Sequence, residues 1–315
     1  MTRVVIIGAG AMGSLFAAHL ARTDAEVWLC DPWREHIEAI AAEGLGVRRG
    51  GEDTRVPLHA TTDPNRPGEA AVLMVFVKFG QTAAALEAAR PMIGAESLIV
   101  TLQNGLGNRE LIRAAAPGRR ILYGLTTLTC ELLGPGRIEA SFAGPGETYL
   151  WPEDGRRDRA VEEVCALLCA AGINAMLAPD IALRIWRKLV VNCCLNTLCA
   201  ITDLPVGALV ERPEIWPLLD GAAAEIAAAA ERNGVPLAPD EARAFLRQVA
   251  WEARAHCPSM LIDVRNRRQT EIECLNGAVL RECERHGLAA PFNRALYGII
   301  RAIEEGYEAR GRAAS

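Results

Sequence analysis

One stretch of the chain combines a lysine with two asparagines at a regular helical spacing. Residues 185–196 are almost wholly apolar and predict a helix, yet they include Lys188, Asn192 and Asn196. A step of four residues on an α-helix turns the side chain by about 40°, so the three polar groups line one face over two turns. Burying an ammonium group and two amides together is costly unless polar groups meet them. Neighbouring helices could satisfy such a stripe, but we favour a stripe that faces a polar substrate.

The start of the chain predicts a phosphate-binding turn. Residues 3–7 predict a buried β-strand, which leads directly into three spaced glycines and then a helix. Gly8 allows a tight turn, Gly10 lets the backbone approach a pyrophosphate, and Gly13 lets the helix pack against the strand. Free amides at the helix N-terminus suit the phosphate charge. The residues expected to hold a dinucleotide here are Gly8, Gly10, Ala11, Met12 and Gly13.

An acid at the end of the second predicted strand bears on the choice of dinucleotide. Asp31 directly follows the strand predicted over residues 26–30. A carboxylate at this place accepts hydrogen bonds from the ribose hydroxyls and would repel a 2′-phosphate. Arg34, three residues further on, could instead meet such a phosphate. We therefore expect NADH or NADPH as the cofactor, with Asp31 favouring NADH.

Two more polar residues follow predicted central strands. Lys78 comes after the apolar run 70–77, and Asn104 comes shortly after the strand predicted over residues 98–102. Ligands of open α/β sheets bind beyond the carboxyl ends of the strands, so both side chains are expected near the nicotinamide half of a dinucleotide. Each could also be an ordinary polar residue at a strand end.

The pattern of predicted elements indicates an α/β fold with two domains. We expect an N-terminal dinucleotide-binding domain of the Rossmann type with a parallel sheet, residues 1–179, and an all-helical C-terminal substrate or catalytic domain, residues 180–315. Helices are predicted over residues 180–200, 214–233, 239–256, 265–286 and 291–309. Segments 137–142 and 148–151, on either side of Gly144-Pro145-Gly146, predict an antiparallel pair at the edge of the sheet.

Composition narrows the function class. The net charge of -5 provides no basic field for nucleic acid or an anionic membrane, and no apolar run reaches the roughly 18 residues of a membrane span. The chain is expected to begin with a strand rather than a leader peptide, and we expect a cytoplasmic protein. The ten cysteines lack the spacing of a metal or disulfide framework, so we expect buried thiols and no metal. The apolar helical domain could support a homodimer.

Five separated motifs resemble the ketopantoate reductase family, the 2-dehydropantoate 2-reductases, over essentially the whole chain. They are Gly8-Ala9-Gly10-Ala11-Met12-Gly13; Val77-Lys78; Gln103-Asn104-Gly105-Leu106-Gly107; Trp186-Arg187-Lys188-Leu189-Val190-Val191-Asn192-Cys193 through Asn196; and Ser259-Met260-Leu261-Ile262-Asp263-Val264, continued by Thr270-Glu271-Ile272 and Asn276-Gly277. The resemblance implies NAD(P)H-dependent reduction of 2-dehydropantoate to (R)-pantoate, a step of pantothenate and coenzyme A biosynthesis.

The resemblance also implies roles for individual residues. Lys188 is the expected general acid, which protonates the C2 carbonyl oxygen as it becomes an alkoxide, and Glu271 is its acidic partner. A lysine with a lowered pKa can both stabilise that charge and supply the proton. The substrate-binding residues implied are Asn104, Asn192, Asn196 and Ser259, with Ser259 on the substrate carboxylate. Lys78 and Asn104 are implied to lie beside the nicotinamide.

The chain departs from the family's pattern in two places, and other functions stay open. A typical member binds NADPH through an arginine just after the second strand, whereas this chain has Cys30-Asp31-Pro32-Trp33-Arg34. His256 stands where relatives often carry an amide. Alternatives are a reductase of a different 2-oxo acid, a related 3-hydroxy acid or opine-type dehydrogenase, and a sensor that binds NAD(H) without turnover. Ser259 could also be an ordinary helix cap.

Overall fold

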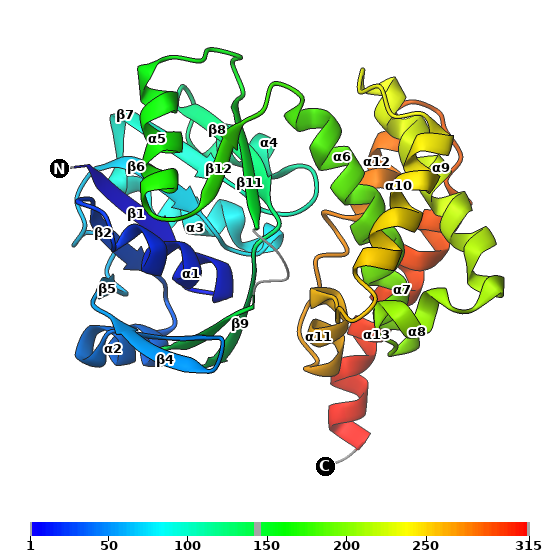
Figure 1. The fold of residues 1–315 in the computed structure, drawn as a ribbon, viewed down its shortest axis with the longest axis horizontal. Helices are drawn as coiled ribbons and strands as arrows, with labels where there is room; N and C mark the ends of the chain where they lie inside the picture. Colours follow the sequence, from blue (N-terminus) through cyan, green and yellow to red (C-terminus); the bar gives the residue numbers. More distant parts are fainter. Residues whose placement is uncertain (1, 142–145, 314–315) are drawn as a thin grey trace. The chain divides into compact units, whose positions relative to one another are not determined.

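The computed structural model describes residues 2–141 and 146–313, and its chain divides into two compact units (Figure 1). The first unit comprises Met1–Gln103 and Asn108–Ile181, and the second comprises Asn104–Gly107 and Ala182–Ser315. The four residues Asn104–Gly107 thus leave the first unit and pack with the second. No helix among the described residues is long and apolar enough to span a membrane.

The first unit is built on a mostly parallel sheet of eight strands within the described residues. Strands β1 and β6 pair in parallel at its centre, and β11 is antiparallel to β8. In spatial order the strands are β12 (Asn174–Leu177), β11 (Glu147–Pro152), β8 (Arg120–Thr126), β7 (Ile93–Thr101), β6 (Ala70–Val75), β1 (Arg3–Ile7), β2 (Glu26–Cys30) and β5 (His59–Thr61). The predicted Rossmann-type α/β fold is confirmed.

The register of the sheet brings the expected cofactor residues to one edge. Ile7 of β1 pairs with Cys30 of β2 and with Val75 of β6, so the three strands end level with one another. Val75 in turn pairs with Thr101 of β7. The segments that follow these strands therefore emerge along the same edge, and each begins with or contains an expected site residue.

Helices cover both faces of this sheet, because its central strands are apolar on both sides. Val4 and Ile6 of β1 belong to a core shared with α1 and α5, whereas Val5 and Ile7 belong to a core shared with α3 and α4. The helices of this unit are α1 (Ala11–Leu20), α2 (Arg34–Glu43), α3 (Thr82–Ala88), α4 (Asn108–Ala115) and α5 (Arg159–Ala170), with short 3-10 turns at Phe79–Gln81 and Arg90–Met92.

Among the described residues, a second sheet of four strands packs against α1. Its order is β4 (Glu52–Val56), β3 (Leu45–Arg49), β10 (Arg137–Ser141) and β9 (Thr129–Gly134). The predicted pairing of segments 137–142 and 148–151 is wrong, since β10 pairs with β9 and β3 while β11 pairs with β8 and β12. Burial of Ile138 and Ala140 in the core below α1 decides this partner choice. Residues 142–145, between the two segments, lie outside the described residues.

All regular secondary structure in the described part of the second unit is helical, as predicted. Its helices are α6 (Ile181–Val191), α7 (Thr197–Thr202), α8 (Val206–Val210), α9 (Trp216–Arg232), α10 (Pro239–Glu252), α11 (Ser259–Arg265), α12 (Asn276–Arg285) and α13 (Pro291–Ala313), with a π-helical turn at Asn192–Asn196 and a 3-10 turn at Pro213–Ile215. The buried residues of α9, among them Ala223, Ile226 and Ala230, form much of its core.

Two predicted helices of this unit are interrupted. The helix expected over 180–200 contains the π-helical turn, and the helix expected over 265–286 is two helices separated by the segment 266–275. The second break occurs because Arg267 adopts a left-handed conformation, with φ of 52°, which ends α11. All ten cysteines are free thiols. Six are buried as expected, but Cys130 and Cys165 are half-buried and Cys169 and Cys257 are exposed, so the expectation of buried thiols is wrong for the two exposed ones.

Candidate active site

In the glycine-rich turn of the first unit, Gly8 and Gly13 are packed against neighbouring backbone, whereas Gly10 borders free space. Gly8 has φ of +99°, and a Cβ atom there would lie 2.7 Å from the backbone of Phe76. A Cβ atom at Gly13 would collide with the carbonyl oxygen of Gly8. A Cβ atom at Gly10 would meet nothing within 4 Å. Only the Gly10 side of the turn therefore leaves space for a phosphate, next to the first amides of α1.

Asp31 ties the second strand to the glycine-rich turn. Its Oδ2 accepts a hydrogen bond from the Ala9 amide at 2.7 Å, and its Oδ1 accepts one from the Trp33 amide at 2.8 Å. Each carboxylate oxygen has a further lone pair and can still accept a bond from a ribose hydroxyl. Asp31 is thus both a structural acceptor and a candidate ribose ligand, and the donor set of the turn fits a dinucleotide.

Ser14 and His36 form a buried pair that the sequence analysis missed, and Ser14 binds the carbonyl side of Ala9. The Ser14 hydroxyl donates to the Ala9 carbonyl at 3.0 Å, and Ser14 Oγ lies 3.3 Å from Nε2 of His36. His36 Nδ1 accepts from the Gly136 amide at 2.9 Å, which leaves the proton on Nε2 of the neutral ring. Burial lowers the pKa of His36. Its position among apolar residues of an amphipathic helix concealed this role.

Lys78 follows β6 in a segment fixed by another residue that the sequence analysis did not assign. The side-chain amide of Gln103 donates to the Val77 carbonyl at 2.7 Å and to the Thr82 hydroxyl at 2.9 Å. The Thr101 hydroxyl donates to the Gln103 Oε1 atom at 2.8 Å. Gln103 therefore locks the segment before Lys78 to the end of β7. A glutamine next to Asn104 at a strand end was the available signal.

In the second unit, the loop Asn104–Gly107 packs against the turn that carries Glu271. The Leu106 amide donates to the Cys274 carbonyl at 2.9 Å, and Gly105, with φ of +79°, lies so close to Cys274 that a side chain would not fit. Asn104 Nδ2 donates to Glu271 Oε2 at 3.0 Å. The loop thus presents an amide directly to the carboxylate that the sequence analysis singled out.

Lys188, on α6, lies near the carboxylate of Glu271. Burial lowers the pKa of Lys188 to about 8, against 10.5 for an ordinary lysine, and the negative charge of Glu271 raises it again in part. The chain has two lysines, Lys78 and Lys188, among thirty-two arginines. An arginine does not release its proton in proteins, whereas a lysine with a lowered pKa does. The second unit therefore contains a single ammonium group able to transfer a proton near neutral pH.

The two asparagines after Lys188 lie on the π-helical turn. Asn196 Nδ2 donates to Asn192 Oδ1 at 3.1 Å, and Asn192 is buried. The stripe predicted for a regular α-helix is therefore altered, because a π-turn opens the spacing of the residues that follow it. Such turns recur at functional sites.

A buried amide network, which the sequence analysis did not assign, supports the π-helical turn. The Asn276 side chain is fully buried, donates to the Cys193 carbonyl at 3.2 Å and accepts from the Thr197 hydroxyl at 2.9 Å. It also donates to Asn293 Oδ1 at 3.1 Å, and Asn293 Nδ2 donates to the Glu225 carboxylate at 2.7 Å. Asn276 thus satisfies a backbone carbonyl of the turn. Its place in the motif Asn276-Gly277 was the available signal in the sequence.

Ser259 lies at the first position of α11 and does not cap it. Pro258 occupies the cap position, no side-chain cap bond is formed, and Ser259 is exposed. Helix α11 packs against the π-helical turn and α7. Ser259 is therefore on a helix next to the asparagines, and its hydroxyl is exposed.

The structure thus assembles the sequence-predicted residues in two groups. Asn104 donates a hydrogen bond to Glu271, Glu271 interacts electrostatically with Lys188, and Asn196 bonds Asn192. The second group belongs to the first unit and follows the strand ends; it comprises Gly8, Gly10, Ala11, Met12, Gly13, Asp31 and Lys78. An ammonium with a lowered pKa, beside a carboxylate and amides, can donate a proton to an oxygen that gains negative charge.

Family models match the chain over nearly its whole length. The model described as "Ketopantoate reductase PanE/ApbA" matches residues 4–154, and the model described as "Ketopantoate reductase PanE/ApbA C terminal" matches residues 180–304. A protein of Streptococcus pyogenes serotype M3 named 2-dehydropantoate 2-reductase is 34% identical over 303 residues, covering 96% of this chain and 97% of that protein.

Two solved structures share the whole fold. The ternary structure of D-mandelate dehydrogenase with NADH and anilino(oxo)acetate has a TM-score of 0.90 at 28% identity and covers 97% of this chain and 99% of its own. The PanE/ApbA family ketopantoate reductase from Ralstonia eutropha JMP134 has a TM-score of 0.88 at 29% identity and covers 96% of this chain and 99% of its own. Both similarities extend over both units.

Proposed function

The chain belongs to the ketopantoate reductase family, a family of oxidoreductases, and we propose that it reduces the C2 ketone of 2-dehydropantoate to the hydroxyl of (R)-pantoate. The observation that carries this proposal is the arrangement of Lys188, Glu271 and Asn104 in the second unit. The ammonium of Lys188 is held near its titration point by burial, and Glu271 opposes its complete neutralisation. Asn104 holds the Glu271 carboxylate in place.

Lys188 acts as the general acid in this proposal. The nitrogen Nζ donates a hydrogen bond to the C2 carbonyl oxygen and stabilises the negative charge that develops there. It then transfers a proton to that oxygen, giving the alcohol and a neutral amine. A pKa of about 8 means that the ammonium form dominates at neutral pH and still gives up its proton readily. Solvent water then returns the proton to Lys188.

The first unit is proposed to hold a nicotinamide dinucleotide, which supplies the hydride. Its pyrophosphate would meet the backbone at Gly8, Gly10 and Gly13 and the amides of Ala11 and Met12, where Gly10 leaves open space. Asp31 would accept hydrogen bonds from the ribose hydroxyls, and its charge favours NADH over NADPH. Lys78 is proposed to contact the nicotinamide half. Asn104 is proposed to contact both the dinucleotide and the oxo acid, because it follows the end of β7 and also bonds Glu271.

The remaining polar residues are proposed to hold the substrate. Asn192 and Asn196 each have an amide that can bond hydroxyl and oxo groups, and their mutual bond orients both. The exposed hydroxyl of Ser259, on a helix that packs against the π-helical turn, is proposed to bind the substrate carboxylate. These roles suit a 2-oxo acid with further oxygen atoms.

Initial rates with a panel of 2-oxo acids test this proposal. The panel contains 2-dehydropantoate, pyruvate, 2-oxoisovalerate and phenylglyoxylate, each measured with NADH and with NADPH. We expect the highest kcat/KM for 2-dehydropantoate. Binding of a dinucleotide without turnover of any oxo acid would instead identify a sensor and contradict the proposal.

A second candidate is the reduction of a bulkier 2-oxo acid. It is favoured by the similarity in fold to D-mandelate dehydrogenase, whose structure was determined with NADH and anilino(oxo)acetate. Asp31 at the end of the second strand is consistent with NADH as the dinucleotide. A kcat/KM for phenylglyoxylate above that for 2-dehydropantoate would favour this candidate, with Lys188 in the same role.

A further inference from the structure

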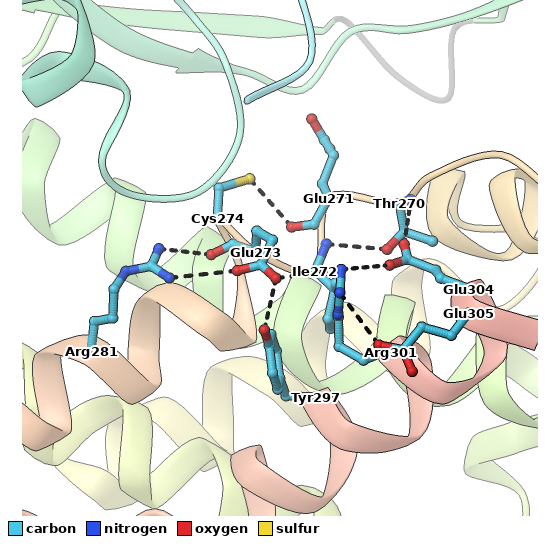
Figure 2. Close-up of polar contacts among 10 residues, drawn as sticks. All are labelled: Thr270, Glu271, Ile272, Glu273, Cys274, Arg281, Tyr297, Arg301, Glu304 and Glu305. Atoms are coloured by element: carbon cyan, nitrogen blue, oxygen red, sulfur yellow. Dashed lines mark hydrogen bonds and ion pairs between the residues drawn. The ribbon is translucent and has the colours of Figure 1, made fainter. Parts of the chain in front are cut away.

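The turn that carries Glu271 is anchored to helix α13. Glu271 lies in the segment between α11 and α12 and is not part of a helix or strand (Figure 2). Its carbonyl oxygen accepts hydrogen bonds from the Cys274 and Leu275 amides, which closes the turn. In Figure 2 its side chain points away from the polar network formed by its neighbours. The position of the carboxylate therefore depends on how firmly the backbone is held.

The anchor on the N-terminal side is Glu304. Its Oε1 atom accepts a hydrogen bond from the Thr270 amide at 2.7 Å, directly before Glu271. The Thr270 hydroxyl accepts a hydrogen bond from the Ile272 amide at 3.2 Å. This bond spans Glu271, so fixing Thr270 also fixes the backbone on both sides of Glu271. The Glu304 side chain is 7% exposed, so few water molecules can compete for its hydrogen bond with the Thr270 amide. A hydrogen bond from a backbone amide to a buried carboxylate is of the strong, charge-assisted kind.

The anchor on the C-terminal side is Glu273. Its Oε1 atom accepts a hydrogen bond from the Tyr297 hydroxyl at 2.7 Å, and its carbonyl accepts one from Arg281 at 2.8 Å. Arg301 lies between the two anchors, with Nη1 at 3.6 Å from Glu273 Oε1 and 3.4 Å from Glu304 Oε2. Arg301 of α13 thus forms ion pairs with both carboxylates (Figure 2).

We propose that Glu304 is a positioning residue for Glu271, since its bond to the Thr270 amide fixes the backbone that aims the Glu271 carboxylate at Asn104 and Lys188. The inference rests on the proposed function, in which Glu271 is the partner of the general acid. Buried Leu296 and Ile300 fix α13 against the rest of the second unit. The helix therefore provides a rigid support for the turn that carries Glu271.

Geometry and charge at position 304 can be separated by two conservative variants. Glu304→Gln removes the charge but keeps an oxygen that can accept from the Thr270 amide. Glu304→Asp keeps the charge but is one methylene too short to reach that amide from a fixed helix. Glu305→Ala is the matched control, because Glu305 is the next residue of α13, is 72% exposed and pairs only with Arg301, at 3.5 Å, among the described contacts.

The first readout is steady-state kinetics of the full chain. We expect Glu304→Asp to lower kcat/KM for the oxo acid by about tenfold, a loss of about 1.4 kcal/mol of transition-state stabilisation. Its KM for the dinucleotide should change less than its KM for the oxo acid, since all the proposed dinucleotide contacts except that of Asn104 lie in the first unit. Glu304→Gln and Glu305→Ala should stay within about threefold of the wild type, well below 1 kcal/mol. Equal kcat/KM for Glu304→Asp and Glu305→Ala would overturn the inference.

The second readout does not need turnover. Because the chain has two lysines, lysine labelled with 13C at Cε gives two resonances, and Lys78→Arg assigns them. Displacement of Glu271 removes the charge that raises the pKa of Lys188, so Glu304→Asp should lower its titration midpoint while Glu304→Gln and Glu305→Ala should not. A change only in melting temperature would show a structural role alone and contradict the inference. If the wild type reduces no oxo acid, the proposed function fails, yet this titration still decides the inference.

Discussion

Asn104 and Glu271 are 167 residues apart in the chain, and Asn104 Nδ2 donates to Glu271 Oε2 at 3.0 Å. The bond is possible because Asn104–Gly107 packs with the helical unit although it continues a segment of the sheet unit. A carboxylate that accepts a bond from an amide keeps one direction, and Glu271 must keep its direction to act on Lys188. The pair therefore connects the loop after β7 to the proposed proton donor.

Asn104→Ala tests this connection. The loss of a hydrogen bond to a charged group costs about 1.5–3 kcal/mol, so we expect kcat/KM for the oxo acid to fall by about one to two orders of magnitude. In a double-mutant cycle with Glu271→Gln, the two losses should be strongly non-additive. Asn266→Ala is the control, since Asn266 is exposed and donates only to the Ile262 carbonyl among the described contacts. Additive losses would show that Asn104 acts independently of Glu271.

The pH dependence follows from the pKa of Lys188. Reduction requires the ammonium form, and burial lowers the pKa of Lys188 to about 8. We therefore expect log kcat/KM for reduction to be level at neutral pH and to fall with unit slope as pH rises through about 8. The lysine NMR titration of the wild type should show the same midpoint for Lys188. A rate that stays level up to pH 10 would contradict the role of Lys188.

Gly10 and Gly13 are expected to respond differently to the same substitution. Gly13→Ala forces a methyl group onto the Gly8 carbonyl and should lower stability by about 1–3 kcal/mol, visible as a lower melting temperature. Gly10→Ala places a methyl group in open space, so the free protein should melt near the wild-type temperature. Its Kd for the dinucleotide should rise by at least roughly tenfold, or about 1.4 kcal/mol. Normal binding by a folded Gly10→Ala protein would argue against the proposed phosphate site.

Asp31→Asn tests the choice of dinucleotide. Asparagine keeps one side-chain oxygen for the Ala9 amide but removes the charge that repels a 2′-phosphate. The ratio of kcat/KM for NADPH to that for NADH should rise about tenfold, because removing a charge near the protein surface is worth on the order of 1 kcal/mol or more. Asp24→Asn, at an exposed position, is the control. A wild type that prefers NADPH would contradict the proposed NADH preference.

Elements with a strong local pattern could be predicted from the sequence. The strand Arg3–Ile7, the turn after it and the helix that follows have their signal in adjacent residues, and the structure contains all three, with the helix at Ala11–Leu20. The pairing of β10 and β11 could not be predicted, because each strand pairs with distant partners chosen by burial. Arg267 likewise carries no residue-type signal for the left-handed conformation that ends α11.

The residues of the candidate site likewise divide into those with a local signal in the sequence and those that depend on distant contacts. Lys188, Asn192 and Asn196 stood out because polar groups are rare within an apolar helix, although the π-helical turn over the last two was not evident. Glu271 was one acid in a charged run and was singled out through the family resemblance alone. The supporting residues Asn276, Gln103 and Glu304 act through contacts with distant segments, which a single sequence does not reveal.

The kcat of Lys188→Ala is the most direct test of the account. Loss of a general acid typically costs about 10²–10⁴-fold in rate, so we expect kcat for the oxo acid to fall by that factor. The Kd for the dinucleotide, measured by fluorescence titration, should stay near the wild-type value because Lys188 is not among the residues proposed to hold the dinucleotide. Lys188→Arg, which keeps the charge but does not release a proton, should be similarly inactive. A Lys188→Ala protein with near-wild-type kcat would contradict the assignment of Lys188 as the proton donor.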